Sequence, residues 1–399
     1  APPHKKDFMQ NKRKKIMFTT VWYPNRYDNM AGLFTRKHAA AISRLNDICV
    51  VYTLPDENVK ITSPLQLEVN NYEGVNEYSL YYHSSSIPVL KKIINFIFFS
   101  AAVIKLLRTV FKNEGRPDIT HVNVLTRWGV VAYLVNKIYG IPYVVTEHWT
   151  RYLPQKNAFK GAVRKFLTKL VCRNASKIMP VSELLKDAMM NNCDLKGDYE
   201  IVENVVDDFF YTPAEPAKND KKIILHVSCF YDEAKNISGI IEATEALKKK
   251  RNDFKVVMLG TGIDYEPLYN KAKDKGLLDV MDFIGEQTPE QVKEWMDKSD
   301  FFLLFSNYET AGVVLQEAVA CGKPWVSSNV GVAQEDTENK NGITMNAGDV
   351  KALVEGMDWM LDHHMDYDPN DLRERAKMYS YDNISKKFNN IYNEVLNTK

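Results

Sequence analysis

SNYETAGVVLQEAVACGKP, residues 306–324, is the stretch of sequence that decides the fold. It follows the apolar run 301–305, which is typical of a buried strand, and it begins with a polar turn that carries Glu309. An apolar helical pattern then covers residues 311–320. A strand, a turn and a helix in this order form the repeating unit of a parallel α/β sheet, and ligands of such sheets bind beside the turn.

The turn has the residue types that an anion site needs. Small residues open the helix, so its free backbone N–H groups and the positive end of its dipole can bind a phosphate. These residues are Thr310, Ala311 and Gly312. Glu317 follows Glu309 by eight residues, so both carboxylates can accept hydrogen bonds from one bound sugar nucleotide. The alternative is that Glu309 is an ordinary helix N-terminal charge and Glu317 part of a solvated face.

The same alternation of strands and helices continues on both sides of this stretch. β-Rich runs predict strands at 15–21, 49–54, 118–122, 143–146, 177–181, 199–202, 223–227, 255–259, 280–284, 325–328 and 342–345. Helical patterns lie between and after them, at 33–45, 90–111, 129–139, 158–173, 182–190, 237–250, 266–276, 289–298 and 350–361. This order predicts parallel sheets with helices on their faces.

A linker divides the pattern into two domains. Residues 213–222, PAEPAKNDKK, are rich in Pro, Ala and charge, and 399 residues exceed the usual size of one compact domain. We therefore predict an α/β protein in which two Rossmann-like, doubly wound domains, 1–212 and 213–382, face each other across a cleft. The last helix, at about 383–399, is predicted to pack back on the first domain.

The formal net charge of +1 hides a strong asymmetry. Residues 1–200 contain 29 Lys and Arg against 16 Asp and Glu, whereas residues 201–399 contain 23 against 35. The two halves therefore carry +13 and −12. A basic half of this kind indicates an anionic partner, for which membrane, nucleic acid and a phosphorylated substrate are the candidates.

The cysteines indicate a reducing compartment, because five of them are widely spaced and form no CxxC pair. They are Cys49, Cys172, Cys193, Cys229 and Cys321. Residues 1–15 are polar and basic, without an apolar signal core, so they are expected to be a solvated leader. The longest apolar run, 93–104, has twelve residues, whereas a membrane-spanning helix needs about 20. We therefore expect a cytoplasmic protein without a membrane span.

Two basic amphipathic segments in the first half favour contact with the anionic inner face of the cell membrane. The basic residues are Lys91, Lys92, Lys105, Arg108 and Lys112 in the first segment, and Lys160, Arg164, Lys165, Lys169 and Arg173 in the second. The alternative for each segment is an ordinary core-facing helix with a solvated basic face. Nucleic acid is not expected as a partner, because neither segment interleaves basic residues with exposed stacking aromatics.

The pattern E-x7-E, continued as EAVACGKP, resembles the donor-site signature of retaining glycosyltransferases of family 4, which have the two-domain GT-B fold. Further matches follow in the family's order across nearly the whole chain. They are YP at 23–24, AGLF at 31–34, PDITH at 117–121, GIPYVVTEH at 140–148, PVS at 180–182, ENVVD at 203–207, KN at 235–236, LGTG at 259–262 and FIG at 283–285. One such match is weak, but the ordered set is specific.

The resemblance implies how the donor would be held. Glu317 would bind the ribose hydroxyls of the nucleotide, and Glu309 would contact the transferred sugar. His148, at a strand end, would contact the same sugar, although a buried histidine with satisfied hydrogen bonds is the alternative. Gly285 and Glu286 lie where the family places the nucleotide base.

The resemblance also implies how the diphosphate would be bound. The amides of 310–313 would donate to it, Lys235 would neutralise it, and the loop at Gly32 would close over it from the first domain. Many family members have an arginine six residues before the lysine as a second diphosphate contact, and Cys229 stands there in this chain. Either another cation serves instead or the donor binds differently. Val332 likewise replaces the second glycine of a family GG pair.

A hexosyltransferase is the activity that the resemblance implies. It would move a sugar from UDP or GDP to a glycan or lipid-linked acceptor with retention of configuration, in cell-surface polysaccharide or glycolipid synthesis. The first domain would bind the acceptor and the second the donor, and neither a metal nor a cofactor is expected. Two other classes remain open, a nucleotide-sugar epimerase on the same fold and a noncatalytic glycan or nucleotide-sugar binder, which Cys229 makes conceivable.

Two short motifs point to other chemistry. DYD at 366–368, after His363 and His364, resembles a metal-binding DxD but has no preceding strand, which favours a solvated loop. Gly260 and Gly262 hint at a dinucleotide site but lack the third glycine of that fingerprint. We therefore expect no metal site at the first motif and no NAD site at the second.

Overall fold

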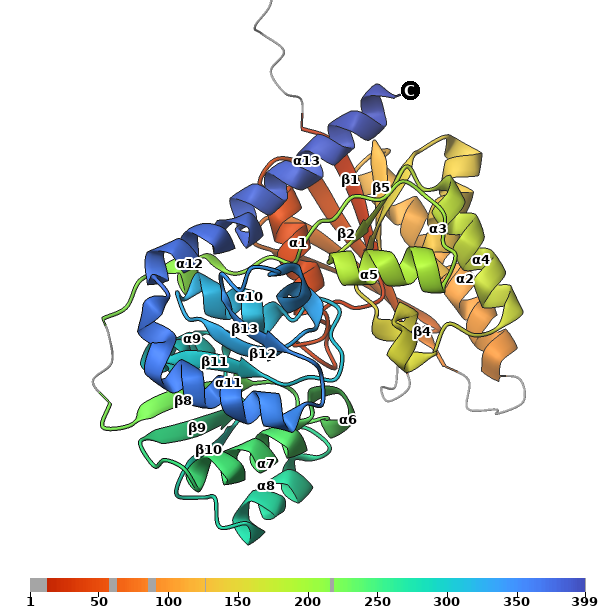
Figure 1. The fold of residues 1–399 in the computed structure, drawn as a ribbon. Helices are drawn as coiled ribbons and strands as arrows, with labels where there is room; N and C mark the ends of the chain where they lie inside the picture. The colour runs from red at the N-terminus through yellow and green to blue at the C-terminus, as the bar shows by residue number, and fades with distance from the viewer. Residues whose placement is uncertain (1–12, 57–62, 85–90, 126, 216–218, 399) are drawn as a thin grey trace, which may run out of the picture.

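The computed structural model describes residues 13–56, 63–84, 91–125, 127–215 and 219–398. Two α/β units follow each other along the chain, each built on one sheet (Figure 1). The two parallel-sheet, Rossmann-like units predicted from the sequence are therefore confirmed. Most of the predicted leader lies outside the described residues, as does part of the predicted linker.

The first sheet has seven strands in the order β3-β4-β2-β1-β5-β6-β7. Their bounds are β1 Lys15–Thr20, β2 Asp47–Asp56, β3 Leu65–Tyr72, β4 Val75–His83, β5 Ile119–Asn123, β6 Tyr143–Glu147 and β7 Lys177–Pro180. All neighbours are parallel except β3, which runs antiparallel to β4 at the edge of the sheet. β1 lies in the centre, where Ile16 pairs with Ile48 on one side and Ile119 on the other.

Helices cover both faces of this sheet. Their bounds are α1 Leu33–Ser43, α2 Lys91–Asn113, α3 Arg127–Tyr139, α4 Ala162–Asn174 and α5 Glu183–Asp187. α2, α3 and α4 pack on one face through a core that contains Phe99, Trp128 and Val171. α1 packs on the other face together with the last helix of the chain, α13 (Tyr381–Asn397).

The second sheet has six parallel strands in the order β10-β9-β8-β11-β12-β13. They are β8 Lys222–Val227, β9 Phe254–Leu259, β10 Met281–Gly285, β11 Phe301–Leu304, β12 Trp325–Ser328 and β13 Gly342–Met345. The helices are α6 Asp232–Lys235, α7 Ile237–Lys248, α8 Tyr265–Asp274, α9 Pro289–Lys298, α10 Val313–Ala320, α11 Val350–His363 and α12 Pro369–Ala376. α7, α8 and α11 cover one face, and α9, α10 and α12 the other.

The chain passes between the units twice, and the two passages lie side by side. The backbone N–H of Val206 donates to the carbonyl of Tyr379 at 3.0 Å, and Val206 forms a parallel bridge with Ser380. After this point α13 lies along the first unit (Figure 1). There the hydroxyl of Tyr392 lies 2.6 Å from Nδ1 of the buried His121.

The structure differs from the sequence prediction at three places. The hairpin of β3 and β4 was not predicted, because β3 is half-exposed and polar residues interrupt its apolar pattern. The signal in the sequence was the pair Glu73 and Gly74, which form the left-handed turn between the two strands. Residues 199–202 form only an isolated bridge, from Tyr199 to Ile178. The helix predicted at 182–190 is present, but only Glu183–Asp187 are α-helical, and a π-helical turn over Ala188–Asn192 continues it.

α2 is longer than its apolar run suggested. It has 23 residues, and by length and composition alone it is the one helix among the described residues that could cross a membrane. Core helices of soluble proteins pass the same test, and α2 packs against the sheet through Phe99, Val103 and Leu106. Its outer face is also apolar, since Ile93, Phe96, Ile97 and Ile104 are all exposed. α2 is therefore a core-facing helix, as the alternative had it, but its outer face carries apolar as well as basic side chains.

Candidate functional site

The N-terminus of α10 is shaped as an anion site. Gly312 caps the helix in the left-handed region with a φ of 72°, so the helix begins two residues later than predicted. Within the described residues, no backbone N–H group of residues 310–313 donates a hydrogen bond. Four adjacent donors at a helix N-terminus suit a phosphate or diphosphate.

Gly331 holds this turn in place. Its backbone approaches so closely that an added Cβ would lie 2.3 Å from the carbonyl oxygen of Ala311. The same carbonyl accepts a hydrogen bond of 2.8 Å from the N–H of Val332. The bond uses only the backbone of Val332, so a side chain at this position is compatible with it.

Lys235 and Glu309 come together from different elements. Lys235 ends α6, Glu309 lies in the turn before α10, and their Nζ and Oε1 atoms are 2.5 Å apart. The Ser306 hydroxyl donates to the same oxygen at 2.8 Å. Burial alone would lower the pKa of Lys235, but the carboxylate of Glu309 raises it above its ordinary value. The ammonium is therefore charged, and with three donors it can bind both Glu309 and an anion.

Glu317 lies between the two units. Its side chain is 13% exposed, and Oε1 is 3.9 Å from Nζ of Lys37 on α1, which also binds Asp207 at 2.7 Å. The alternative that Glu317 belongs to a solvated face is therefore wrong. Burial and, more weakly, Asp207 raise the pKa of Glu317 to about 7, against the opposing effect of Lys37. Its protonation thus changes near neutral pH.

His148 lies directly after β6 and is buried. Its ring packs 4.6 Å from that of Phe34 and 5.3 Å from that of His38, and Nε2 lies 3.4 Å from Oδ1 of Asn123. Burial, followed by the charges of His38 and His121, lowers its pKa well below the ordinary value. The imidazole is therefore neutral, which suits hydrogen bonding to a sugar better than proton transfer.

The remaining predicted residues follow the carboxyl ends of strands. Gly32 caps α1 with a φ of 62°, and an added Cβ would lie 2.3 Å from the carbonyl oxygen of Trp22. Gly285 ends β10 with a φ of 90°, and Glu286 after it is exposed. Cys229 is exposed in the loop after β8. Carboxyl ends of parallel strands line the ligand-binding edge of such sheets.

Cross-unit contacts surround the α10 turn, and sequence reasoning missed most of them. The hydroxyl of Ser182 donates to the carbonyl of Thr310 at 2.5 Å. Lys156, from the first unit, binds the hydroxyl of Tyr308 at 2.7 Å and the carboxylate of Glu233 at 2.8 Å. Lys156 and Lys37 carried no local signal, because only the packing of the two units brings them to the site.

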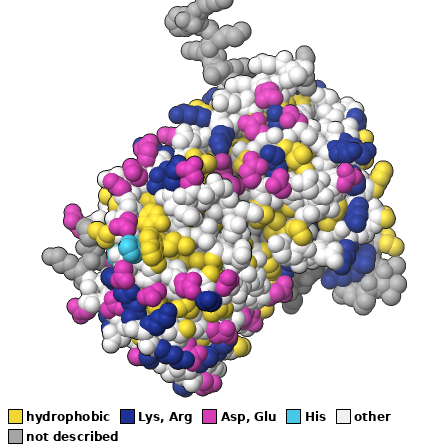
Figure 2. All heavy atoms as spheres, viewed as in Figure 1, with side chains coloured by type: hydrophobic (Ala, Val, Ile, Leu, Met, Phe, Trp, Pro, Cys, Tyr) yellow, Lys and Arg dark blue, Asp and Glu magenta, His cyan; other side chains and the backbone are white. Residues whose placement is uncertain are grey.

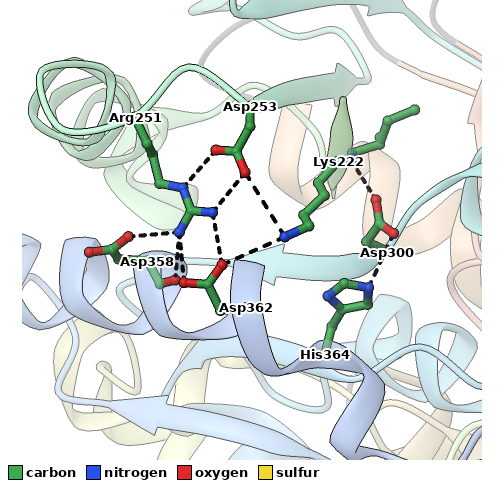
Figure 3. A network of polar contacts seen from close by, with 8 residues as sticks. Lys222, Arg251, Asp253, Asp300, Asp358, Asp362 and His364 are labelled. Carbon is green, nitrogen blue, oxygen red and sulfur yellow. Dashed lines mark hydrogen bonds and ion pairs between the residues drawn. The ribbon is translucent and has the colours of Figure 1, made fainter. Parts of the chain in front are cut away.

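The DYD segment is exposed to solvent, as predicted, but it forms a 3-10 turn and a helix cap rather than an irregular loop. His363 stacks on Trp359 and bonds to Asp366 at 2.9 Å, and Asp368 caps α12. His364 lies 3.3 Å from Asp300, next to the network of Arg251 shown in Figure 3. Among the described residues, no group of three or more His, Cys, Asp or Glu side chains could hold a metal ion.

Arg251 binds three aspartates at the amino edge of the second sheet (Figure 3). They are Asp253, before β9, and Asp358 and Asp362 on α11. Lys222, at the start of β8, lies 3.6 Å from Asp362. The amino edge is opposite the α10 turn, so we assign this network to structure rather than to the site.

Comparison with known proteins identifies the family of the chain. Residues 208–382 match the family Glycosyl transferases group 1, and residues 61–208 match Glycosyltransferase Family 4. The chain belongs to the group 1 glycosyltransferases. The predicted family and GT-B fold are therefore confirmed, and the protein is a glycosyltransferase.

Individual relatives agree with this assignment. An uncharacterized glycosyltransferase of Methanocaldococcus jannaschii is 26% identical over 318 residues, 79% of each chain. The N-acetyl-alpha-D-glucosaminyl L-malate synthase of Bacillus anthracis is 25% identical over 70% of this chain and 75% of its own length. The crystal structure of Anabaena HepE in complex with UDP has a TM-score of 0.69 at 15% identity, covering 96% of this glycosyltransferase and all of that chain.

Proposed function

We propose that this glycosyltransferase moves a hexose with retention from a UDP- or GDP-sugar to a glycan or lipid-linked acceptor, in cell-surface polysaccharide or glycolipid synthesis. The observation that carries the proposal is the free N-terminus of α10 beside Lys235. Both supply positive charge to one point of an otherwise acidic half of the chain. A nucleotide diphosphate is the leaving group that needs such a point.

The residues at this point suit the departure of a diphosphate. When the bond between the anomeric carbon and the diphosphate oxygen breaks, its electron pair stays on the diphosphate. Lys235 and the amides of 310–313 are already in place when that charge develops, so they stabilise the transition state. A single well-placed donor lowers the activation free energy by about 3 kcal/mol. The positive charge comes from the chain itself, so the proposal needs neither a metal ion nor a cofactor.

Glu309 is placed to bind the sugar rather than to attack it. Lys235 and Ser306 both contact its Oε1, which reduces its power as a nucleophile. We therefore propose that the acceptor hydroxyl attacks the same face that the diphosphate leaves. A diphosphate oxygen takes the hydroxyl proton, the new glycosidic bond forms, and the nucleoside diphosphate departs.

We assign the ribose to Glu317 and the base to the loop at Gly285. A buried carboxylate can accept both ribose hydroxyls. The structure of Anabaena HepE, which shares this fold, is in complex with UDP, which supports a nucleoside diphosphate at this place. The relatives are named as transferases and synthases, so an epimerase and a noncatalytic binder are not favoured.

For the location, we propose the inner face of the cell membrane, where the first unit would contact anionic lipid. The exposed apolar residues on α2 support this, as do Val163 and Phe166 on α4, which are 73% and 65% exposed. Basic residues adjoin both helices. Apolar side chains flanked by lysine and arginine are typical of surfaces that bind anionic membranes.

Donor screening tests the proposed reaction. The full chain is incubated with UDP- and GDP-sugars, with and without a lipid-linked acceptor, and the products are followed by mass spectrometry. We expect free nucleoside diphosphate and a glycosylated acceptor, and Glu317→Ala should abolish donor binding. Isomerised donor without acceptor would identify an epimerase. If no nucleotide sugar binds or reacts, and Glu317→Ala changes nothing, the proposal is wrong.

A further inference from the structure

A cavity lies in the first unit, apart from the α10 turn. Its volume is about 400 Å³, and it is formed by the starts of α3 and α4 and by the turn after β6. Leu125, Val130 and Leu167 contribute to its apolar wall. The charged residues that line it are Arg127, Arg151 and Arg164. Apolar walls with only cationic charged groups fit an anionic amphiphile.

Within the described parts of the chain, none of the three guanidinium groups forms an ion pair with a carboxylate, and the charge of Glu147 acts only weakly on Arg151. Arg151 stacks 3.1 Å from the ring centre of Trp149, and its buried Nε has no hydrogen-bond partner there. Arg127 lies over the ring of Phe99 on α2, at 5.2 Å. Burial and the nearby charge of Arg164 lower the pKa of Arg151. Positive charge is therefore concentrated in the cavity. Other arginines of this chain, such as Arg251, are instead paired with carboxylates.

An apolar surface continues from the cavity. Val163 lines it and is 73% exposed, and Phe166 on the same helix is 65% exposed. α2, α3 and α4 each begin at the carboxyl edge of the sheet, so the exposed Ile93 and Phe96 lie at the same end of the helix layer. Figure 2 shows hydrophobic and basic side chains next to each other on the side of the molecule where α3 and α4 lie.

The cavity lies beside the reaction centre. Trp149 lines it and packs at 5.1 Å on Trp22, which contacts Phe34, the ring that packs on His148. The backbone N–H groups of His148 and Trp149 both donate to Oε1 of Glu147. The cavity wall and the histidine assigned to the sugar are thus consecutive residues fixed by one carboxylate.

From this arrangement we infer that the cavity binds the phosphorylated head of a lipid acceptor. The phosphate or diphosphate would contact Arg127, Arg151 and Arg164, and the hydrocarbon chain would follow the exposed apolar residues of α4 and α2. The inference rests on the proposed function, since it names the acceptor of that reaction. Guanidinium groups bind phosphate through paired, charge-assisted hydrogen bonds.

Calorimetry with octyl phosphate, below the concentration at which it forms micelles, tests the inference. We expect the full chain to bind octyl phosphate more tightly than octanol or inorganic phosphate, because only octyl phosphate has both parts. Arg151→Gln and Arg164→Gln should each weaken binding about tenfold. Val163→Asn, at an exposed position that needs no repacking, should weaken the binding of octyl phosphate but leave the binding of inorganic phosphate unchanged.

The matched control is Arg173→Gln, at the exposed far end of α4, which should leave binding unchanged. Equal affinity for octyl phosphate and octanol, or equal losses in Arg164→Gln and Arg173→Gln, would overturn the inference. So would binding of anionic vesicles without binding of octyl phosphate, because it would indicate a membrane surface only. UDP binding is measured on the same samples, and its failure in the wild type would count against the proposed function instead.

Discussion

Glu317 is a carboxylate that is buried where its charged form is disfavoured. Burial raises its pKa to about 7, whereas an unfolded chain has a glutamate pKa of about 4.3. Between these two values the folded state keeps a proton that the unfolded state releases. The free energy of unfolding should therefore fall as the pH rises through this window, and no further above it.

Glu317→Gln should remove this loss. We expect the variant to gain about 2 kcal/mol in free energy of unfolding over the wild type between pH 5 and pH 8, measured by denaturant titration. The gain should build up between the two pKa values and stay constant above about pH 7. Glu286→Gln changes an exposed carboxylate and is the control. A difference between Glu317→Gln and wild type that does not change with pH would contradict the raised pKa.

Lys235 should matter more to the reaction than to the fold. Lys235→Ala removes the ammonium proposed to neutralise the leaving diphosphate, so kcat should fall by about 100-fold or more. Lys248→Ala is the control, because Lys248 forms its ion pair with Asp279 on the surface of the same unit. The loss should persist at saturating donor. A variant with unchanged kcat and only a raised KM would show that Lys235 binds the donor without assisting its cleavage.

Among the elements, the turn before α10 depends on one glycine of another segment. Gly331 has a φ of 53°, and an added Cβ would meet the carbonyl of Ala311. Gly331→Ala should therefore lower the free energy of unfolding by about 2–4 kcal/mol. It should also weaken donor binding, because the amides of 310–313 move. Calorimetric titration with UDP and denaturant unfolding measure the two effects.

Gly348→Ala separates backbone strain from the clash. Gly348 has a φ of 81°, but an added Cβ would meet nothing within 4 Å. Gly348→Ala should lower the free energy of unfolding by only about 1 kcal/mol and leave UDP binding intact. If both alanine variants lose stability equally and bind UDP equally, then the contact between Gly331 and Ala311 does not hold the donor turn.

The elements show which features a sequence can predict. The strand, turn and helix at 301–320 are encoded locally, by an apolar run, small residues and a helical period, and they occur within two residues of the prediction. β3 was missed because one edge strand with a half-exposed face has no strong period. Lys37, Lys156 and the arginine cavity were missed because they depend on tertiary packing.

For the whole molecule, the net charge of +1 combines two different surfaces. The acidic half holds the proposed donor site, where Lys235 and a helix N-terminus create local positive potential. The basic half presents exposed apolar side chains on α2 and α4. A molecule divided in this way would approach an anionic membrane with the first unit and leave the second unit in water.

Liposome binding by the full chain follows from this division. We expect binding to vesicles that contain anionic lipid, weaker as the salt concentration rises, because the Debye length falls from about 10 Å at 0.1 M to about 3 Å at 1 M. The double variant Phe96→Ser, Ile97→Ser should bind at least about tenfold more weakly, since each side chain contributes about 1.5–3 kcal/mol when buried in the interface. Ile263→Ser is the control, because Ile263 is 81% exposed but lies in the acidic half. Absence of binding at every salt concentration, or an equal loss in the control, would mean that the apolar face of α2 has another occupant.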